Sequence, residues 1–371
     1  MISKNEKIYL AGHTGLVGSA LMRKLTDKGY AGIVSSTIDE LDLKDNVRVD
    51  EFFRKEKPAY VFLAAAKVGG IVANNTYRAD FIYENIQIQN NVIINAWKHG
   101  VKKLIFLGSS CIYPKNAPQP LKEEYLLTSE LEYTNEPYAI AKIAGIKMCE
   151  AFNLQYGTNF LCVMPTNLFG PNDNFDLERS HVMPAIIRKL HLGKCLMNND
   201  VPALRRDFSR YPVEGIDGSA EEEEIMKKLS KYGISRDNNG VVVQFWGTGT
   251  PRREFLHSDD VADAIVFIFE NLDFNDLIED PSMLKAEVKN IRNTHINIGR
   301  GEDIAIKDLA TLIAEITGFK GRVEWDTSRP DGTMQKLMDV SKLTRLGWKP
   351  KLSLKEGIEK VYEFYSPSCP S

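Results

Sequence analysis

The chain has 371 residues, of which 43% are hydrophobic and 26% charged, a composition typical of an ordinary soluble globular protein. Its formal net charge of -3 provides no positive field that would attract nucleic acid or an anionic membrane, so we expect neither as a partner. Any phosphate group must therefore be bound by local groups.

The cysteines argue for a reducing compartment. They show neither Cys-x-x-Cys spacing nor clustering with histidine, which argues against a disulfide framework and against a zinc site; they are Cys111, Cys149, Cys162, Cys195 and Cys369. The N-terminus lacks the apolar core of an export signal, and no segment approaches the roughly 20 apolar residues that span a bilayer. We expect a cytoplasmic protein without a metal ion.

A glycine turn opens the chain. Residues 8–11 form a β-prone run, residues 16–28 have helical periodicity, and between them lies the run Gly12, His13, Thr14, Gly15, Leu16, Val17, Gly18. Glycines between a strand and a helix allow a tight turn and a close approach of the backbone to a pyrophosphate. The helix N-terminus adds amide donors, so this context predicts a bound dinucleotide.

Strands and helices alternate after this turn. We expect strands near residues 33–34, 60–63, 104–107 and 160–163, separated by helices near 46–55, 79–99 and 138–156. Alternation at this pitch predicts an α/β fold with a doubly wound parallel sheet of the Rossmann type.

A tyrosine and a lysine lie one turn apart on the last of these helices. Tyr138 and Lys142 share a helix face, and an ammonium group can lower the pKa of a phenol from about 10 toward neutrality. Such a tyrosine can give or take a proton during turnover. Ser109 and Cys111 follow the apolar strand 104–107 and are expected nearby.

The second half of the chain has a different texture. A helix is expected at 181–191, and further elements near 241–246, 259–270, 295–298, 304–316 and 322–325. We expect residues 1–171 to form mainly the dinucleotide-binding domain and 172–371 mainly a smaller α/β substrate-binding lobe, interleaved with elements that return to the first domain. Residues 198–240 are expected as an insertion without a sheet strand, a solvated surface helix or, on a sharper hypothesis, a lid over the substrate.

Several segments carry a more specific resemblance. Ser-Ser-Cys-Ile-Tyr-Pro-Lys at 109–115 and Asn-Glu-Pro-Tyr-Ala-Ile-Ala-Lys at 135–142, with the segments 64–71, 164–171 and 253–257, resemble the GDP-L-fucose synthase family of extended short-chain dehydrogenase/reductases. The resemblance implies conversion of GDP-4-keto-6-deoxy-D-mannose to GDP-L-fucose by epimerisation at C3 and C5 and NADPH-dependent reduction at C4. It also implies a homodimer.

The resemblance assigns roles to individual residues. Cys111 is the expected base and His181 the expected acid of the epimerisations, while Tyr138 protonates the reduced oxygen, Ser109 holds it and Lys142 lowers the tyrosine pKa. Expected cofactor contacts are Gly12, His13, Thr14, Gly15, Leu16, Val17, Gly18, Asp39, Leu107, Gly108, Ser109, Ser110, Lys142, Pro165, Thr166, Asn167, Leu168 and His181. Expected substrate contacts are Lys189, Trp246, Arg253, Asp331 and Lys336.

The sequence departs from the family where the coenzyme is selected. Family members often hold the 2'-phosphate of NADP with arginines at positions that here are Thr14 and Ile38. The nearby hydroxyls of Ser35, Ser36 and Thr37 can bind a phosphate, whereas Asp39 would repel one if it points at the ribose. NADP(H) is the expected coenzyme, and NAD(H) is a possible one. The rival functions are an NAD-dependent nucleotide-sugar 4-epimerase or 4,6-dehydratase and a non-catalytic dinucleotide sensor.

Overall fold

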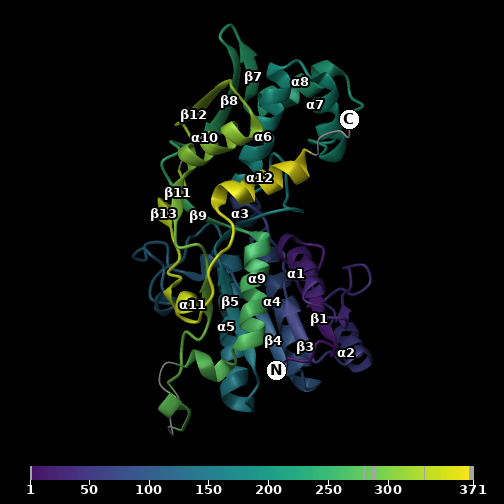
Figure 1. The fold of residues 1–371 in the computed structure, drawn as a ribbon, viewed down its shortest axis with the longest axis vertical. Helices are drawn as coiled ribbons and strands as arrows, with labels where there is room; N and C mark the ends of the chain where they lie inside the picture. The colour runs from purple at the N-terminus through teal and green to yellow at the C-terminus, as the bar shows by residue number, and fades with distance from the viewer. Residues whose placement is uncertain (1, 279–280, 286–289, 330, 367–371) are drawn as a thin grey trace. The chain divides into compact units, whose positions relative to one another are not determined.

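The computed structural model describes residues 2–278, 281–285, 290–329 and 331–366 (Figure 1). Cys369 lies outside these residues. The chain forms two compact units, and each is assembled from three separate segments. Unit 1 contains Met1–Leu168, Glu254–Glu302 and Leu337–Leu352, and unit 2 contains Phe169–Arg253, Asp303–Lys336 and Ser353–Ser371.

Unit 1 is built on a six-stranded sheet with the order β10-β5-β4-β3-β1-β2, in which every pair of neighbours is parallel. The Rossmann-type fold predicted from the alternating elements is thus confirmed. The strands are β1 Ile8–Ala11, β2 Ile33–Val34, β3 Tyr60–Leu63, β4 Lys103–Leu107, β5 Phe160–Pro165 and β10 Ile296–Ile298. The α-helices are α1 Leu16–Asp27, α2 Asn46–Glu56, α3 Ile71–Thr76, α4 Arg78–Lys98, α5 Glu136–Tyr156, α9 Ser258–Asn271 and α11 Ser341–Arg345. Short 3-10 helices are η1 Ser110–Ile112, η2 Glu123–Tyr125, η3 Phe274–Leu277 and η4 Pro281–Lys285.

The strands of this sheet are buried on both faces because helices cover each side. Successive residues of β1 point to opposite faces: Ile8 joins the core that includes α1 and α9, whereas Tyr9 joins the core that includes α2, α4 and α5. In Figure 1, α9 and α1 belong to one such layer, and the two helices pack against each other. The strand order reverses between β1 and β3, so ligands are expected at their carboxyl ends.

Unit 2 is a smaller α/β assembly. Its three-stranded sheet has the order β12-β8-β7, with β12 parallel and β7 antiparallel to β8. Its elements are α6 Val182–Met197, α7 Val201–Arg210, α8 Glu222–Lys231, β7 Ile234–Asp237, β8 Gly240–Trp246, β11 Asp303–Ala305, α10 Ile306–Thr317, β12 Arg322–Asp326, β13 Gln335–Lys336 and α12 Leu354–Tyr365. Two strands pass from one unit to the other, β6 Asn167–Phe169 and β9 Arg252–His257.

The expectation for residues 198–240 was wrong in one respect, because this stretch does contain a sheet strand. β7 pairs with β8 over four residues, and the preceding α7 and α8 bury apolar side chains such as Leu204, Phe208 and Leu229. Asp207 of α7 forms a buried ion pair with Arg188 of α6. The stretch is therefore part of the core of unit 2 and more than a solvated surface helix.

Within the described ranges, no helix combines the length and the apolar character that crossing a bilayer requires.

Candidate active site

The glycine turn leaves no room for side chains at two positions. Gly12 has φ +86°, and a Cβ there would lie 2.6 Å from the backbone nitrogen of Ala65. At Gly18 a Cβ would lie 1.9 Å from the carbonyl oxygen of Gly12. Gly15 caps α1 without a side-chain hydrogen bond, so the first amides of the helix are not occupied by a cap. This donor set and the close backbone fit a dinucleotide pyrophosphate.

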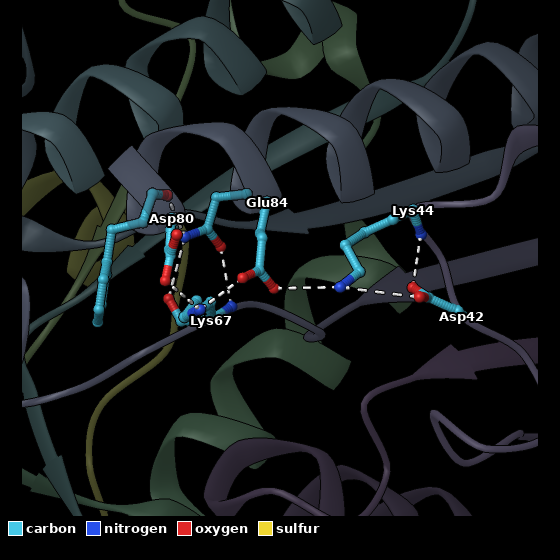
Figure 2. Close-up of polar contacts among 7 residues, drawn as sticks. Asp42, Lys44, Lys67, Asp80 and Glu84 are labelled. Atoms are coloured by element: carbon cyan, nitrogen blue, oxygen red, sulfur yellow. Dashed lines mark hydrogen bonds and ion pairs between the residues drawn. The ribbon is translucent and has the colours of Figure 1, made fainter. Parts of the chain in front are cut away.

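The loop after β3 lies against this turn and is held by α4. The side chain of Asn85 accepts a hydrogen bond from the backbone N–H of Lys67 and donates one to the carbonyl of the same residue, both at 3.0 Å. The Lys67 ammonium contacts Asp80 at 3.3 Å and also pairs with Glu84 (Figure 2). The hydrogen bond to Glu84 raises the pKa of Lys67, so the ammonium group is fully charged at neutral pH.

The same network reaches the loop after β2. In Figure 2, Lys44 lies between Glu84, at 3.4 Å, and Asp42, at 3.7 Å. One carboxylate of α4 thus ties together the two loops that follow β2 and β3. Both loops lie at the carboxyl edge of the sheet, so the network fixes the surface where a dinucleotide is expected.

Tyr138 and Lys142 lie on α5, as predicted. Pro137 lies in the first turn of the helix, at a position that needs no backbone N–H, and Gly157 caps the C-terminal end in the left-handed conformation. The Lys142 ammonium donates to the carbonyl oxygen of Leu107 at 2.8 Å, and it lies 5.7 Å from the centre of the Tyr138 ring. The lysine therefore links the helix to the end of strand β4.

The pKa of Tyr138 differs from the expectation. Burial, followed by the charge of Cys111, raises the pKa of the phenol above its ordinary value, although a hydrogen bond from Ser109 acts in the opposite direction. Burial also lowers the pKa of Lys142 to about 8. The sequence identified the cation beside the phenol, but desolvation is the largest cause of both shifts: it raises the pKa of the phenol and lowers that of the ammonium group.

Ser109 and Cys111 meet the same two residues. Ser109 caps η1, and its Oγ accepts a hydrogen bond from the Cys111 backbone N–H at 3.4 Å. Cys111 is 7% exposed, and its thiol interacts electrostatically with both Tyr138 and Lys142. Four expected catalytic side chains of unit 1 therefore lie together at the end of β4.

Sequence reasoning missed the groups that hold this turn. The Tyr113 hydroxyl, directly after η1, donates to Asn297 Oδ1 at 2.5 Å and lies 3.1 Å from His295 Nε2. The Asn297 amide donates in turn to the Leu121 carbonyl at 2.9 Å. All of these partners are distant in sequence, so no local pattern could have indicated them.

A buried carboxylate, also missed, supports the loop after β5. Glu254 is 0% exposed, and its side chain accepts from the backbone N–H groups of Arg300, of Gly301 at 2.6 Å and of Met338 at 2.9 Å. Its own carbonyl accepts from Thr166 Oγ1 at 3.4 Å and Asn167 Nδ2 at 2.9 Å. A charged residue inside the run 252–257 was the available signal, because an unpaired carboxylate is rarely buried.

The other expected residues of unit 1 follow the carboxyl edge of the sheet. Leu107 ends β4 and Pro165 ends β5, and Gly108, Ser110 and Leu168 lie in the segments that follow these strands. Asp39 is exposed in the loop after β2.

The remaining expected residues belong to unit 2. His181 is exposed and caps the N-terminus of α6. On the same helix, burial lowers the pKa of Lys189 to about 8, and its ammonium donates to the Gln244 carbonyl at 3.1 Å. Lys189 also lies 5.4 Å from the centre of the Phe245 ring, so a cation is held against β8 without a carboxylate among these contacts.

Two more expected cations are neighbours on adjacent strands. Arg253 of β9 is the register partner of Lys336 of β13 in a parallel pair, which directs both side chains to one face of the sheet.

Trp246 ends β8 with 65% of its surface exposed. Asp331 accepts hydrogen bonds from Thr248, from the backbone N–H at 2.9 Å and from Oγ1 at 2.7 Å. Unit 2 thus carries the five expected substrate contacts.

Comparison with known proteins agrees with this geometry. The model of the NAD dependent epimerase/dehydratase family matches residues 8–209 and 213–281. The chain is 50% identical to GDP-L-fucose synthase 1 of Arabidopsis thaliana over 98% of its length and 94% of that protein. It is 45% identical to GDP-L-fucose synthase of Escherichia coli (strain K12), over 97% of this chain and 96% of that protein.

A solved structure adds to the comparison. A GDP-D-glycero-L-gluco-heptose synthase of Campylobacter jejuni, determined in the presence of NADPH, has a TM-score of 0.88 and 45% identity over 98% of this chain and 99% of that one. Full-length similarity at these levels goes beyond a shared fold. The chain belongs to the GDP-L-fucose synthase family of NAD dependent epimerases and dehydratases.

Proposed function

We propose that this protein converts GDP-4-keto-6-deoxy-D-mannose to GDP-L-fucose, with epimerisation at C3 and C5 and reduction at C4. The coenzyme is NADP(H). The observation that carries the proposal is the meeting of Cys111, Tyr138, Ser109 and Lys142 at the end of β4. A simple ketone reductase needs no thiol there, whereas an epimerase needs a group that removes protons from carbon.

The epimerisations use the acidity that the C4 ketone gives to the hydrogens at C3 and C5. In our scheme Cys111 removes a proton from one face of the ring, and His181 returns one from the opposite face. Ser109 and Tyr138, which are hydrogen-bonded to each other, donate to the C4 oxygen where enolate charge develops.

The reduction uses the same oxygen site. NADPH, when bound, supplies the hydride for C4. The raised pKa keeps Tyr138 protonated at neutral pH, and an alkoxide is a stronger base than a phenolate, so the phenol can still donate its proton to the forming hydroxyl. Lys142 stabilises the phenolate that this transfer leaves behind.

In this scheme unit 2 binds the nucleotide diphosphate. Lys189, Arg253 and Lys336 supply cations for the two phosphates, and the exposed Trp246 offers an aromatic face. Asp331 can accept from a ribose hydroxyl or from guanine through lone pairs that the two donors of Thr248 leave open.

The proposal is tested by incubating the enzyme with GDP-4-keto-6-deoxymannose and NADPH in deuterated water. Wild type should produce fucose labelled at C3 and C5. Cys111→Ser should lose both the label exchange and the product, because the base is weakened. Tyr138→Phe should lose mainly the reduction, while some exchange persists. Cys149→Ser, which alters another buried cysteine of unit 1, is the matched control.

Two results would contradict the scheme. Equal exchange in wild type and Cys111→Ser would remove the thiol as the base. Turnover without added reduced coenzyme would instead indicate an enzyme that regenerates its own bound NAD, as the rival 4-epimerases do.

A GDP-linked keto-heptose is a second candidate substrate. It is favoured by the similarity to the C. jejuni protein named for heptose synthesis, whose identity equals that to the E. coli fucose synthase. The ratio of kcat/KM for the two sugar nucleotides, measured on one preparation, decides between them.

We also propose a homodimer in the cytoplasm. Helices α4 and α5 pack side by side and leave Tyr83, Trp97 and Ile140 exposed by 64%, 38% and 41%. A second copy of this pair would cover them, and light scattering after size exclusion gives the mass that tests this. The four described cysteines are buried and form no disulfide with one another, which suits a reducing compartment.

A further inference from the structure

Charged and polar side chains gather at the turn after β2. The Glu40 carboxylate accepts from the Thr37 backbone N–H at 2.8 Å and from Thr37 Oγ1 at 3.1 Å. These two bonds, together with the charge of His13 in the glycine turn, hold the pKa of Glu40 below its ordinary value. One amide donor, one hydroxyl donor and one imidazole therefore already surround an anionic group at this turn.

Arg48 brings a permanent charge to the same place. Its guanidinium donates to the Glu40 carbonyl oxygen at 2.5 Å, across eight residues of chain. Within the described part of the chain, no carboxylate lies within ion-pair distance of Arg48, so its charge faces only a neutral oxygen and solvent. Lys44, the other cation close by in sequence, already pairs with Glu84 and Asp42 (Figure 2).

His13 has an unused polar atom. Its Nδ1 is buried and makes no hydrogen bond among the residues that the structure describes. His13 belongs to the turn that fits the pyrophosphate, and its electrostatic interaction with the Glu40 carboxylate contributes to the lowered pKa of that group. A buried nitrogen without a partner is costly unless a ligand completes its hydrogen bond.

We propose that Arg48, assisted by His13 and Thr37, binds the 2'-phosphate of NADPH, and that Glu40 opposes this binding and so sets the coenzyme preference. A phosphate dianion needs cations and N–H or O–H donors, and Arg48, His13 and Thr37 provide groups of both kinds around this turn. The Glu40 carboxylate occupies the Thr37 donors that a phosphate would use and repels a second anion. The inference rests on the proposed coenzyme of the proposed function.

The test measures coenzyme binding directly, by fluorescence titration of the full-length protein with NADPH and with NADH in the absence of sugar nucleotide. Arg48→Ala should raise the Kd for NADPH about tenfold and change that for NADH less than about twofold, since a charge-assisted contact to the phosphate is lost. Glu40→Gln should lower the Kd for NADPH severalfold without tightening NADH. Arg54→Ala, an exposed arginine on the same helix α2, should change neither.

Two outcomes would overturn the inference. In one, Arg48→Ala weakens both coenzymes equally or neither. In the other, Glu40→Gln leaves the ratio of the two Kd values unchanged. Thermal melting of each variant checks that it is folded, and exposed positions on α2 and its preceding loop make folding of these variants the expectation. Because no sugar is present, this result is independent of whether the label-exchange experiment succeeds.

Discussion

Burial of charge is the feature that single residues of the site share. The ammonium of Lys142 has a pKa of about 8, compared with an ordinary value of 10.5, because it is enclosed by protein. Keeping it charged at neutral pH costs roughly 3 kcal/mol, and the chain carries this cost where the lysine contacts Leu107 and lies near Tyr138. A cost of this kind is typical of sites that function requires.

Lys142→Met should therefore stabilise the fold while abolishing reduction. We expect about 1–2 kcal/mol of added stability at pH 7, since the lost hydrogen bond to Leu107 offsets part of the gain. The folded pKa lies below the unfolded one, so wild type becomes more stable as pH rises from about 8 to 10.5, and the advantage of the variant should close over that window.

Denaturant unfolding at pH 7 and pH 10 measures this difference. Lys147→Met on the same helix, whose lysine is half-buried and contacts Glu150 at 3.0 Å, is the control for removing an ammonium group from α5. A variant at position 142 that is equally destabilised at both pH values would refute the argument.

At the level of elements, the contact between α6 and α7 makes residues 198–240 part of the packed core of unit 2. Arg188 and Asp207 have side chains that are 0% and 3% exposed, joined by bonds from Nε at 3.0 Å and Nη2 at 2.8 Å. The Tyr365 hydroxyl of α12 donates to the other oxygen of Asp207. Removing residues 200–238 would therefore leave this arginine buried without its partner.

Asp207→Asn is the sharper experiment on these elements. Removing one charge of a buried pair should lower the free energy of unfolding by about 3–5 kcal/mol, because the other charge stays uncompensated. Glu223→Gln breaks an exposed pair with Lys227 on α8 and should cost less than about 0.5 kcal/mol. Comparable losses for the two variants, measured in urea, would show that the pair at α6 and α7 is not a core contact.

At the scale of the whole molecule, each compact unit is assembled from segments that are separated in the sequence. Unit 1 is completed by Glu254–Glu302 and Leu337–Leu352, which follow the whole first stretch of unit 2 in the sequence. This return supplies α9, whose Val261, Ile265 and Phe269 are fully buried against the sheet, and the edge strand β10. The dinucleotide-binding unit is thus not a continuous segment.

A fragment of residues 1–171 should consequently fail to fold. Each large buried side chain of α9 contributes about 1.5–3 kcal/mol, so losing several removes as much as the roughly 5–15 kcal/mol by which a domain is stable. Size exclusion and circular dichroism of the purified fragment test this. A monomer with a cooperative unfolding transition would contradict it.

The sequence by itself determined the elements whose signals are local. Apolar runs at 60–63 and 104–107, the glycine turn and the helical spacing of Tyr138 and Lys142 indicated the parallel sheet and the residues beside it, because periodicity and turn chemistry need only neighbouring residues. The resemblance supplied the reaction for the same reason, since its motifs are short and contiguous.

Only the tertiary structure decided the remainder. The strand Ile234–Asp237 ends in polar residues and forms because β8 offers it a partner, and Tyr113, Asn297 and Glu254 meet partners far away in the chain. The structure raises the pKa of Tyr138, whereas the lysine one turn away had predicted a lowered pKa. The sequence shows the spacing of the two residues but does not show how deeply both groups are enclosed. Desolvation depends on every atom packed around a group, and that packing exists only once the chain has folded.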